Sequence, residues 1–166
     1  MTLLDVYDAQ ATRLEKTTYC SNSYTDDEYV MSVSLCVFDT VGNLLIRKTS
    51  RYSDMWDLSI NTYVHHGETC LKALKREIRN LPCLDSALRA RFDMQIRTPG
   101  IIKTYYAIRK NDLQASQEAV QYNSKDIRFA SYEDVLTLMD HGKFPAYDPK
   151  ILKHLFAFGL YQCPAI

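Results

Sequence analysis

Apolar and polar positions alternate along several stretches of the first third of the chain, and this period of two predicts β-strands. Residues 30–39 are rich in Val and Phe, and Gly42 with Asn43 supplies a turn before the apolar stretch 44–50, so we expect a hairpin. The strands predicted here span residues 3–9, 13–20, 30–39, 44–50 and 56–58.

After residue 58 the pattern changes to the period of a helix. Four apolar residues recur at the spacing of one buried helix face. They are Leu71, Leu74, Ile78 and Leu81. Pro82 ends this predicted helix, because proline disfavours helical backbone at the residue before it.

The second half of the chain predicts further strands and two helices with marked ends. Ser131 and Asp134 predict a capping box, Gly142 predicts the end of that helix, and Asp148 with Pro149 predicts the start of the next. The strands span 91–99, 101–110 and 126–131, and the helices span 132–142 and 149–160. The packing face of the last helix comprises Ile151, Leu152, Leu155, Phe156 and Leu160.

The order of strands, helix, strands and helices predicts a mixed α/β sandwich in which helices cover a sheet. We expect a single domain, residues 1–166, because this length suits one hydrophobic core. Asp85 or Ser86 is expected to cap a short helix through Arg91. The polar stretch 111–125 leaves room for one short helical piece.

Composition is that of an ordinary globular protein, with 46% hydrophobic and 24% charged residues. Twenty acidic residues balance twenty basic ones, so nothing draws the whole chain toward nucleic acid or an anionic membrane. No apolar run is long enough to cross a bilayer, and residues 1–10 lack the pattern of a secretory signal, so a cytoplasmic protein is expected. The twelve Tyr residues supply amphipathic surface for a homodimer contact.

The five cysteines are scattered and form no Cys-x-x-Cys pair, which favours neither a disulfide framework nor a zinc knuckle. We interpret them as small buried side chains or unused thiols.

The stretch 56–84 resembles the Nudix box, the strand-loop-helix signature of hydrolases acting on nucleoside diphosphates linked to another group. That box runs Gly, five residues, Glu, seven residues, Arg-Glu, an apolar residue, one more, Glu-Glu, one more, Gly and an apolar residue. The matching positions are Glu68, Arg76, Glu77, Ile78 and Leu84. The departures are Thr62 for the first Gly, Asn80 and Leu81 for the paired Glu, and Cys83 for the last Gly.

The resemblance continues outside the box, in a Nudix subgroup related to isopentenyl diphosphate isomerase. Residues 3–17 are similar to the DxYDE-type opening of that subgroup, 55–69 to its MWDLS-x-GGHV-x-x-GET segment, and 126–144 to its strand-then-helix ending. The resemblance implies the Nudix fold, a mixed sheet sandwiched between helices with an N-terminal strand pair. Prenyl isomerisation is less expected, because the Cys and Glu machinery of that reaction has no counterpart here.

The resemblance implies separate roles for the box residues. Glu68 and Arg76 would form a brace between loop and helix, with a secondary electrostatic part for Glu68 in catalysis. Glu77 would be the remaining catalytic carboxylate and ligand for Mg²⁺ or Mn²⁺, or alternatively a solvated helix acid. Mg²⁺ prefers several oxygen ligands in octahedral order, so one carboxylate beside Asn80 makes a poor site, and Leu81 provides no ligand.

Two more family features are changed. Asn61 and Thr62 replace a Gly-Gly pair whose carbonyl approaches the metal, and a late-loop Glu would fall near Tyr122 or Asn123. Glu118 or Asp126 could replace the lost acids. A second possibility is a soft metal site formed by His65 or His66 with Cys70, although these histidines can equally be surface residues.

Substrate contacts are predicted at the end of the hairpin. Arg47 and Arg51, with Lys48 between them, form a phosphate clamp in one interpretation and a solvated strand end in the other. Trp56 is either a base-stacking platform or a core residue. Two functions stay open: a divergent hydrolase with weak or lost catalysis, and a non-catalytic module that binds a nucleotide, a diphosphate or a protein partner.

Overall fold

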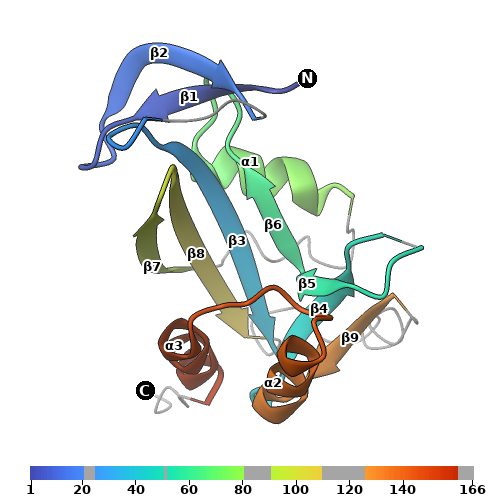
Figure 1. Ribbon diagram of the computed structural model, residues 1–166. Coiled ribbons are helices and arrows are strands. Elements are labelled where there is room, and N and C mark those ends of the chain that lie inside the picture. The colour runs from blue at the N-terminus through green and yellow to red at the C-terminus, as the bar shows by residue number, and fades with distance from the viewer. Residues whose placement is uncertain (21–24, 51, 81–90, 110–125, 161–166) are drawn as a thin grey trace.

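The computed structural model describes residues 1–20, 25–50, 52–80, 91–109 and 126–160. Figure 1 shows a sheet with helices on both sides and an N-terminal strand pair across one end. The elements are β1 (Leu3–Tyr7), β2 (Arg13–Tyr19), β3 (Val30–Phe38), β4 (Leu44–Lys48), β5 (Trp56–Leu58), β6 (Ile60–Tyr63), α1 (Cys70–Ile78), β7 (Arg91–Thr98), β8 (Ile101–Arg109), β9 (Ile127–Ala130), α2 (Tyr132–Asp140) and α3 (Pro149–Leu160).

The predicted strands are confirmed, and β3 is the centre of the sheet. It pairs in parallel with β8 from Val30 to Phe38, and antiparallel with β6 from Ser32 to Leu35. The order across the sheet is β5-β4-β3-β8-β7, with β6 on β3 and β9 on β4. The hairpin of β3 and β4 closes through Asp39, whose carboxylate accepts hydrogen bonds from the backbone of the turn.

Side chains alternate along β3 and build two cores, one on each face of the sheet. Val33, Leu35 and Val37 face α1, whose Ala73, Leu74 and Ile78 are buried against them. Cys36 and Phe38 face the opposite side, where α2 and α3 pack. The expected α/β sandwich is therefore the observed architecture.

The predicted face of α1 is partly wrong. Leu71 is 50% exposed, whereas Ala73, which the apolar spacing passed over, is fully buried. The side chain of Thr69 caps the helix by accepting from the backbone of Lys72, and the helix ends at Ile78, earlier than expected. Leu81 lies outside the described residues, as do residues 85–90 of the expected short helix and the stretch 111–125. Arg91, the expected last residue of that helix, is instead the first residue of β7.

The two C-terminal helices confirm their predicted starts. Ser131 and Asp134 form a reciprocal capping box at α2, and Gly142 adopts a positive φ of 66° just after that helix. In α3, Leu152, Leu155 and Phe156 are buried as expected. No helix among the described residues is long and apolar enough to cross a membrane.

The N-terminal strand pair is confirmed and is held to the rest of the fold by backbone bonds. Leu4 forms an isolated bridge with His65, and Tyr7 forms one with Tyr29. The carbonyl of Leu3 also accepts a hydrogen bond from His66. The pair therefore lies against the loop between β6 and α1, close to the region that resembles the Nudix box (Figure 1).

Candidate functional site

Arg76 joins the loop after β6 to α1 and is the centre of the box region. Its Nε donates to Glu68 Oε1 at 3.0 Å, and its Nη2 donates to Glu68 Oε2 at 3.2 Å and to the Tyr63 carbonyl at 2.9 Å. Its Nη1 also contacts the carboxylate of Glu77. The predicted pairing of Glu68 with Arg76 is therefore present, and one guanidinium serves both acids.

Glu68 is ionised and ordered by this arrangement. Burial opposes its charge, but Arg76 and the backbone N–H of His65, which donates to Oε2 at 3.0 Å, outweigh that effect and hold the pKa of Glu68 below its usual value. The loop that presents Glu68 turns at Gly67, whose φ of 75° is accessible to glycine at little cost.

Glu77 has neighbours unlike those of a metal-binding carboxylate. Besides Arg76, its Oε1 accepts a hydrogen bond of 3.4 Å from the hydroxyl of Thr62, the residue that stands at the first Gly of the box pattern. Asn80, at the position of the first paired Glu, is exposed. These groups do not fit a hard divalent ion, which needs several free oxygen ligands rather than an arginine already in contact with its carboxylate.

The other suggested ligands lie apart or face other partners. His66 Nδ1 lies 2.7 Å from Asp5, and the half-buried thiol of Cys70 contacts the sulfur of Met31 at 3.3 Å, with its pKa raised by burial. His65 Nδ1 is 4.0 Å from Glu68. Within the part of the chain that the structure describes, no three His, Cys, Asp or Glu side chains are grouped to hold a metal ion. Glu118 lies outside that part.

The structure describes two of the three basic residues at the end of the hairpin. Arg47 and Lys48 are both half-buried, and Arg51 lies outside the described residues. Trp56 is 9% exposed in the core, with Lys48 Nζ 5.6 Å and the Arg128 guanidinium 5.1 Å from its ring centroid. The Trp56 ring therefore makes cation–π contacts with two basic side chains.

A pocket of about 670 Å³ was not foreseen from the sequence. It is lined by parts of β3, β6, β7 and β8 and by the start of α3, so it lies over the face of the sheet opposite α1. Thr62 also contributes to the lining, but its register partner Val33 belongs to the core on the α1 side, and its hydroxyl contacts Glu77 on that side.

A chain of hydrogen bonds joins three residues that line this pocket, Asn61, Tyr147 and Lys103, through Asp57. The hydroxyl of Ser34 donates to Asn61 Oδ1 at 3.1 Å, and Asn61 Nδ2 donates to Asp57 Oδ2 at 2.9 Å. Asp57 Oδ1 accepts from the Tyr147 hydroxyl at 3.0 Å, and that hydroxyl accepts from Lys103 Nζ at 3.2 Å. Burial and the charge of Asp57 raise the pKa of Tyr147, which keeps it a neutral donor. Asn61, one of the two changed glycine positions, is therefore part of the pocket.

Comparison with known proteins gives the fold. No family model matches the chain. Two uncharacterised Nudix hydrolases, of Listeria monocytogenes and Listeria innocua, are each 29% identical over 72% of this chain and 74% of their own length. A crystal structure of a Deinococcus radiodurans protein superposes with a TM-score of 0.68 at 20% identity, over 92% of this chain and 98% of its own. The chain has the Nudix fold.

A solution structure of the same Deinococcus radiodurans protein describes it as a hypothetical Nudix protein, and gives a TM-score of 0.48 at 20% identity over 95% of each chain.

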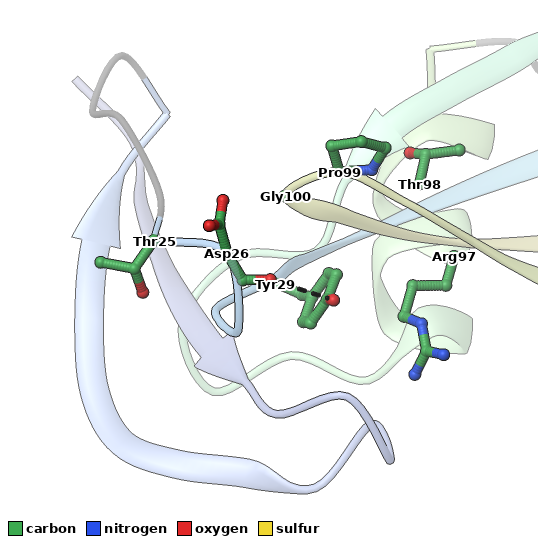
Figure 2. A pocket seen from close by; sticks show the side chains of 7 residues that line it. All are labelled: Thr25, Asp26, Tyr29, Arg97, Thr98, Pro99 and Gly100. Atoms are coloured by element: carbon green, nitrogen blue, oxygen red, sulfur yellow. Dashed lines mark hydrogen bonds between the residues drawn. The ribbon is translucent and has the colours of Figure 1, made fainter.

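A second pocket of about 470 Å³ lies at the far end of β7 and β8 of this Nudix fold (Figure 2). Thr25, Asp26 and Tyr29 line one wall, and residues 97–100 line the other. The Tyr29 hydroxyl donates to the Asp26 carbonyl at 3.3 Å, and the Arg97 guanidinium lies 5.8 Å from the Tyr29 ring centroid. The residues lining it come from outside the box.

The strand pair is tied to the box loop through Asp5, which is only 2% exposed. Burial disfavours its charge, but hydrogen bonds from the Gly67 N–H at 3.0 Å and from His66, with Arg13 at 3.3 Å, outweigh this and lower the pKa of Asp5. The carboxylate therefore connects the N-terminal segment with the turn that presents Glu68.

We expect Asp5→Asn to lower the free energy of unfolding by about 1 to 2 kcal/mol near neutral pH, because the neutral amide loses the ion pair with Arg13 and cannot accept hydrogen bonds from both Gly67 and His66 with its single oxygen as the carboxylate does with two. Because the pKa of Asp5 is lower in the folded state, its stabilisation is complete above the unfolded pKa of about 4 and is lost as pH falls through the folded value. Chemical denaturation of both proteins as a function of pH measures this. A gap between them that stays constant into strong acid would contradict the role of the carboxylate.

Proposed function

We propose that this protein derives from Nudix hydrolases of nucleoside diphosphate-linked substrates and that its hydrolysis of phosphoanhydrides is weak or lost. Glu68 and Arg76 retain the role of a structural brace, and Glu77 is the one box carboxylate of α1 that could face a substrate. The ligand is a nucleotide or another diphosphate compound, which occupies the pocket beside β6.

The observation that carries the proposal is the state of Glu77. Its carboxylate contacts Arg76 and accepts from Thr62, and the next position of the pattern is an exposed amide, Asn80. A Nudix-type hydrolase uses a divalent ion to activate water, and that ion would need to displace Arg76 from the only carboxylate offered on α1. Displacement leaves the guanidinium with Glu68 and the Tyr63 carbonyl, so ion binding costs the contact between Arg76 and Glu77.

A second function is favoured by the pocket itself. The hydrogen-bonded chain from Ser34 to Lys103, which includes three lining residues of the pocket, contains none of the carboxylate positions of the box pattern. A non-catalytic module that binds a nucleotide or diphosphate would keep this pocket although the metal-binding residues of the box are replaced. The two functions share a ligand class and differ in turnover.

We expect purified protein to show turnover well below about 1 s⁻¹, the lower end of typical enzyme values, on nucleoside diphosphate sugars, dinucleoside polyphosphates and capped RNA with Mg²⁺ or Mn²⁺. Any residual rate should be no more than modestly changed by Glu77→Gln. Turnover at or above that value which Glu77→Gln abolishes would show an intact catalytic site and would overturn the proposal.

A variant that restores the paired carboxylates tests the proposal from the opposite direction in the same assay. Asn80→Glu with Leu81→Glu returns the paired carboxylates, and we expect metal-dependent turnover to rise above that of the natural protein. A cost of roughly 1 to 3 kcal/mol in stability is expected if the Leu81 side chain packs in the core. Asn80→Gln with Leu81→Gln is the matched control, because it changes side-chain size without adding charge.

A further inference from the structure

Lys103 stands inside the pocket with little to neutralise it. Its ammonium lies 4.9 Å from the ring centroid of Tyr147 and 5.4 Å from that of Tyr105. Among the described residues it has one hydrogen-bond acceptor, the Tyr147 hydroxyl, and forms no salt bridge. An ammonium has three donors, so this leaves two of them without a described protein acceptor.

Ser32 is the neighbour of Lys103 across the sheet. The two residues are register partners on β3 and β8, so their side chains project from the same face, and both line the pocket. Ser32 is 6% exposed, and its hydroxyl is the one buried side-chain polar atom without a hydrogen-bond partner in the part of the chain that the structure describes. Burying a hydroxyl unpaired costs about 1 to 3 kcal/mol, so such groups ordinarily have a partner.

The other charges around the pocket leave these two donors uncommitted. Asp57 already accepts from Asn61 and Tyr147, and Asp148 is exposed at the rim, where it accepts from the backbone of Lys150. Burial lowers the pKa of Lys103, and the more distant charge of Asp57 offsets this only in part. Arg97 adds a second cation to the lining.

We propose that this pocket binds a phosphoryl group of its ligand, with phosphoryl oxygens accepting hydrogen bonds from Lys103 Nζ and the Ser32 hydroxyl. The remainder of the ligand would lie along Tyr105 and the apolar wall formed by Ile96 and Ile151. The phosphoryl group satisfies the orphaned hydroxyl and compensates the desolvated ammonium with one partner. This inference rests on the proposed function for the ligand class, but it needs neither hydrolysis nor a metal ion.

The test is a titration of the protein with inorganic phosphate and with pyrophosphate in EDTA, followed by NMR shifts of backbone amides. We expect saturable shifts at β3 and β8. Lys103→Met should weaken binding roughly 10- to 100-fold, and Ser32→Ala roughly 10-fold, as for loss of hydrogen bonds to a charged group. Lys153→Met is the matched control: it removes the same charge from an exposed position on α3 and should leave affinity unchanged.

The outcomes separate this inference from the proposed function. Binding that survives Lys103→Met in a folded protein, or that Lys153→Met weakens equally, would overturn it, as would the absence of saturable shifts. Ser32→Ala removes only one oxygen and is not expected to unfold the chain. It therefore still tests the proposed contact if Lys103→Met fails to fold. EDTA removes divalent ions, so the titration reports phosphate binding without metal-dependent hydrolysis. Phosphate binding can therefore fail while hydrolysis is found with Mg²⁺, and phosphate can bind while no hydrolysis is found.

Discussion

Arg76→Met is expected to lower the free energy of unfolding by about 2 to 3 kcal/mol. The guanidinium bonds both oxygens of Glu68 and the carbonyl of Tyr63, and it contacts Glu77. Methionine keeps the aliphatic length but leaves two carboxylates without their shared counterion. The side chains of Arg76, Glu68 and Glu77 are 29%, 20% and 24% exposed, so water screens the loss only in part.

Arg79→Met measures how much of this effect comes from lost charge alone. Arg79 follows α1 directly, is exposed, and shares none of the hydrogen-bond partners of Arg76 among the described residues, so its loss should cost less than about 0.5 kcal/mol. Urea denaturation of the two variants beside the natural protein gives both values. Equal losses would show that the brace adds nothing to stability. If the free energy falls for Arg76→Met alone, Glu68→Gln should reproduce much of the fall.

The same contacts explain what could be read from the sequence at this site. The spacing of Glu68 and Arg76 matches the Nudix box pattern, in which an acid in the loop pairs with an arginine in the following helix. The pairing could therefore be expected from the sequence. The contact between Thr62 and Glu77 could not, because it depends on how β6 is placed beside α1. The sequence shows that a glycine position is occupied by Thr62, but only the structure shows that the new hydroxyl faces the box acid.

The pocket illustrates the larger limit. Its hydrogen-bonded chain joins Asp57 to Tyr147, ninety positions later, and Tyr147 to Lys103, forty-four positions away. Local periodicity places each of these residues on an element or a loop, but it carries no information about which elements meet. The strands and helices themselves depend on near neighbours in sequence, which is why their types were predicted well.

Leu71 shows the limit within a single helix. Its spacing from Leu74 and Ile78 fits one apolar face, yet it lies in the first turn of α1, at the edge of the covered area, and is half exposed. Ala73 takes the buried place because α1 approaches β3 closely enough that a small side chain fills the gap. Periodicity identifies a face, but the distance between elements decides which residues on its border are covered.

Gly159→Leu is expected to destabilise the fold by about 3 kcal/mol, because α3 packs directly on Phe38. A Cβ at position 159 would lie 2.5 Å from Phe38 Cδ1 and 2.9 Å from its Cγ, and Phe38 is itself fully buried. The ring cannot move freely, since it also packs edge-on against Phe156 with centroids 5.8 Å apart. A glycine inside a helix costs about 1 kcal/mol relative to alanine, and this close approach is its physical reason.

Ala157→Leu provides the comparison on the same helix, since Ala157 is half-buried and lines an open groove with room for a larger side chain. Thermal and urea denaturation should place it close to the natural protein. Adding Phe38→Ala to Gly159→Leu should cost less than the sum of the two single changes, because the leucine fills the space that the ring leaves. Strict additivity would mean that the two side chains do not compete for one space, and the position of α3 on the pocket-bearing face would then need another explanation.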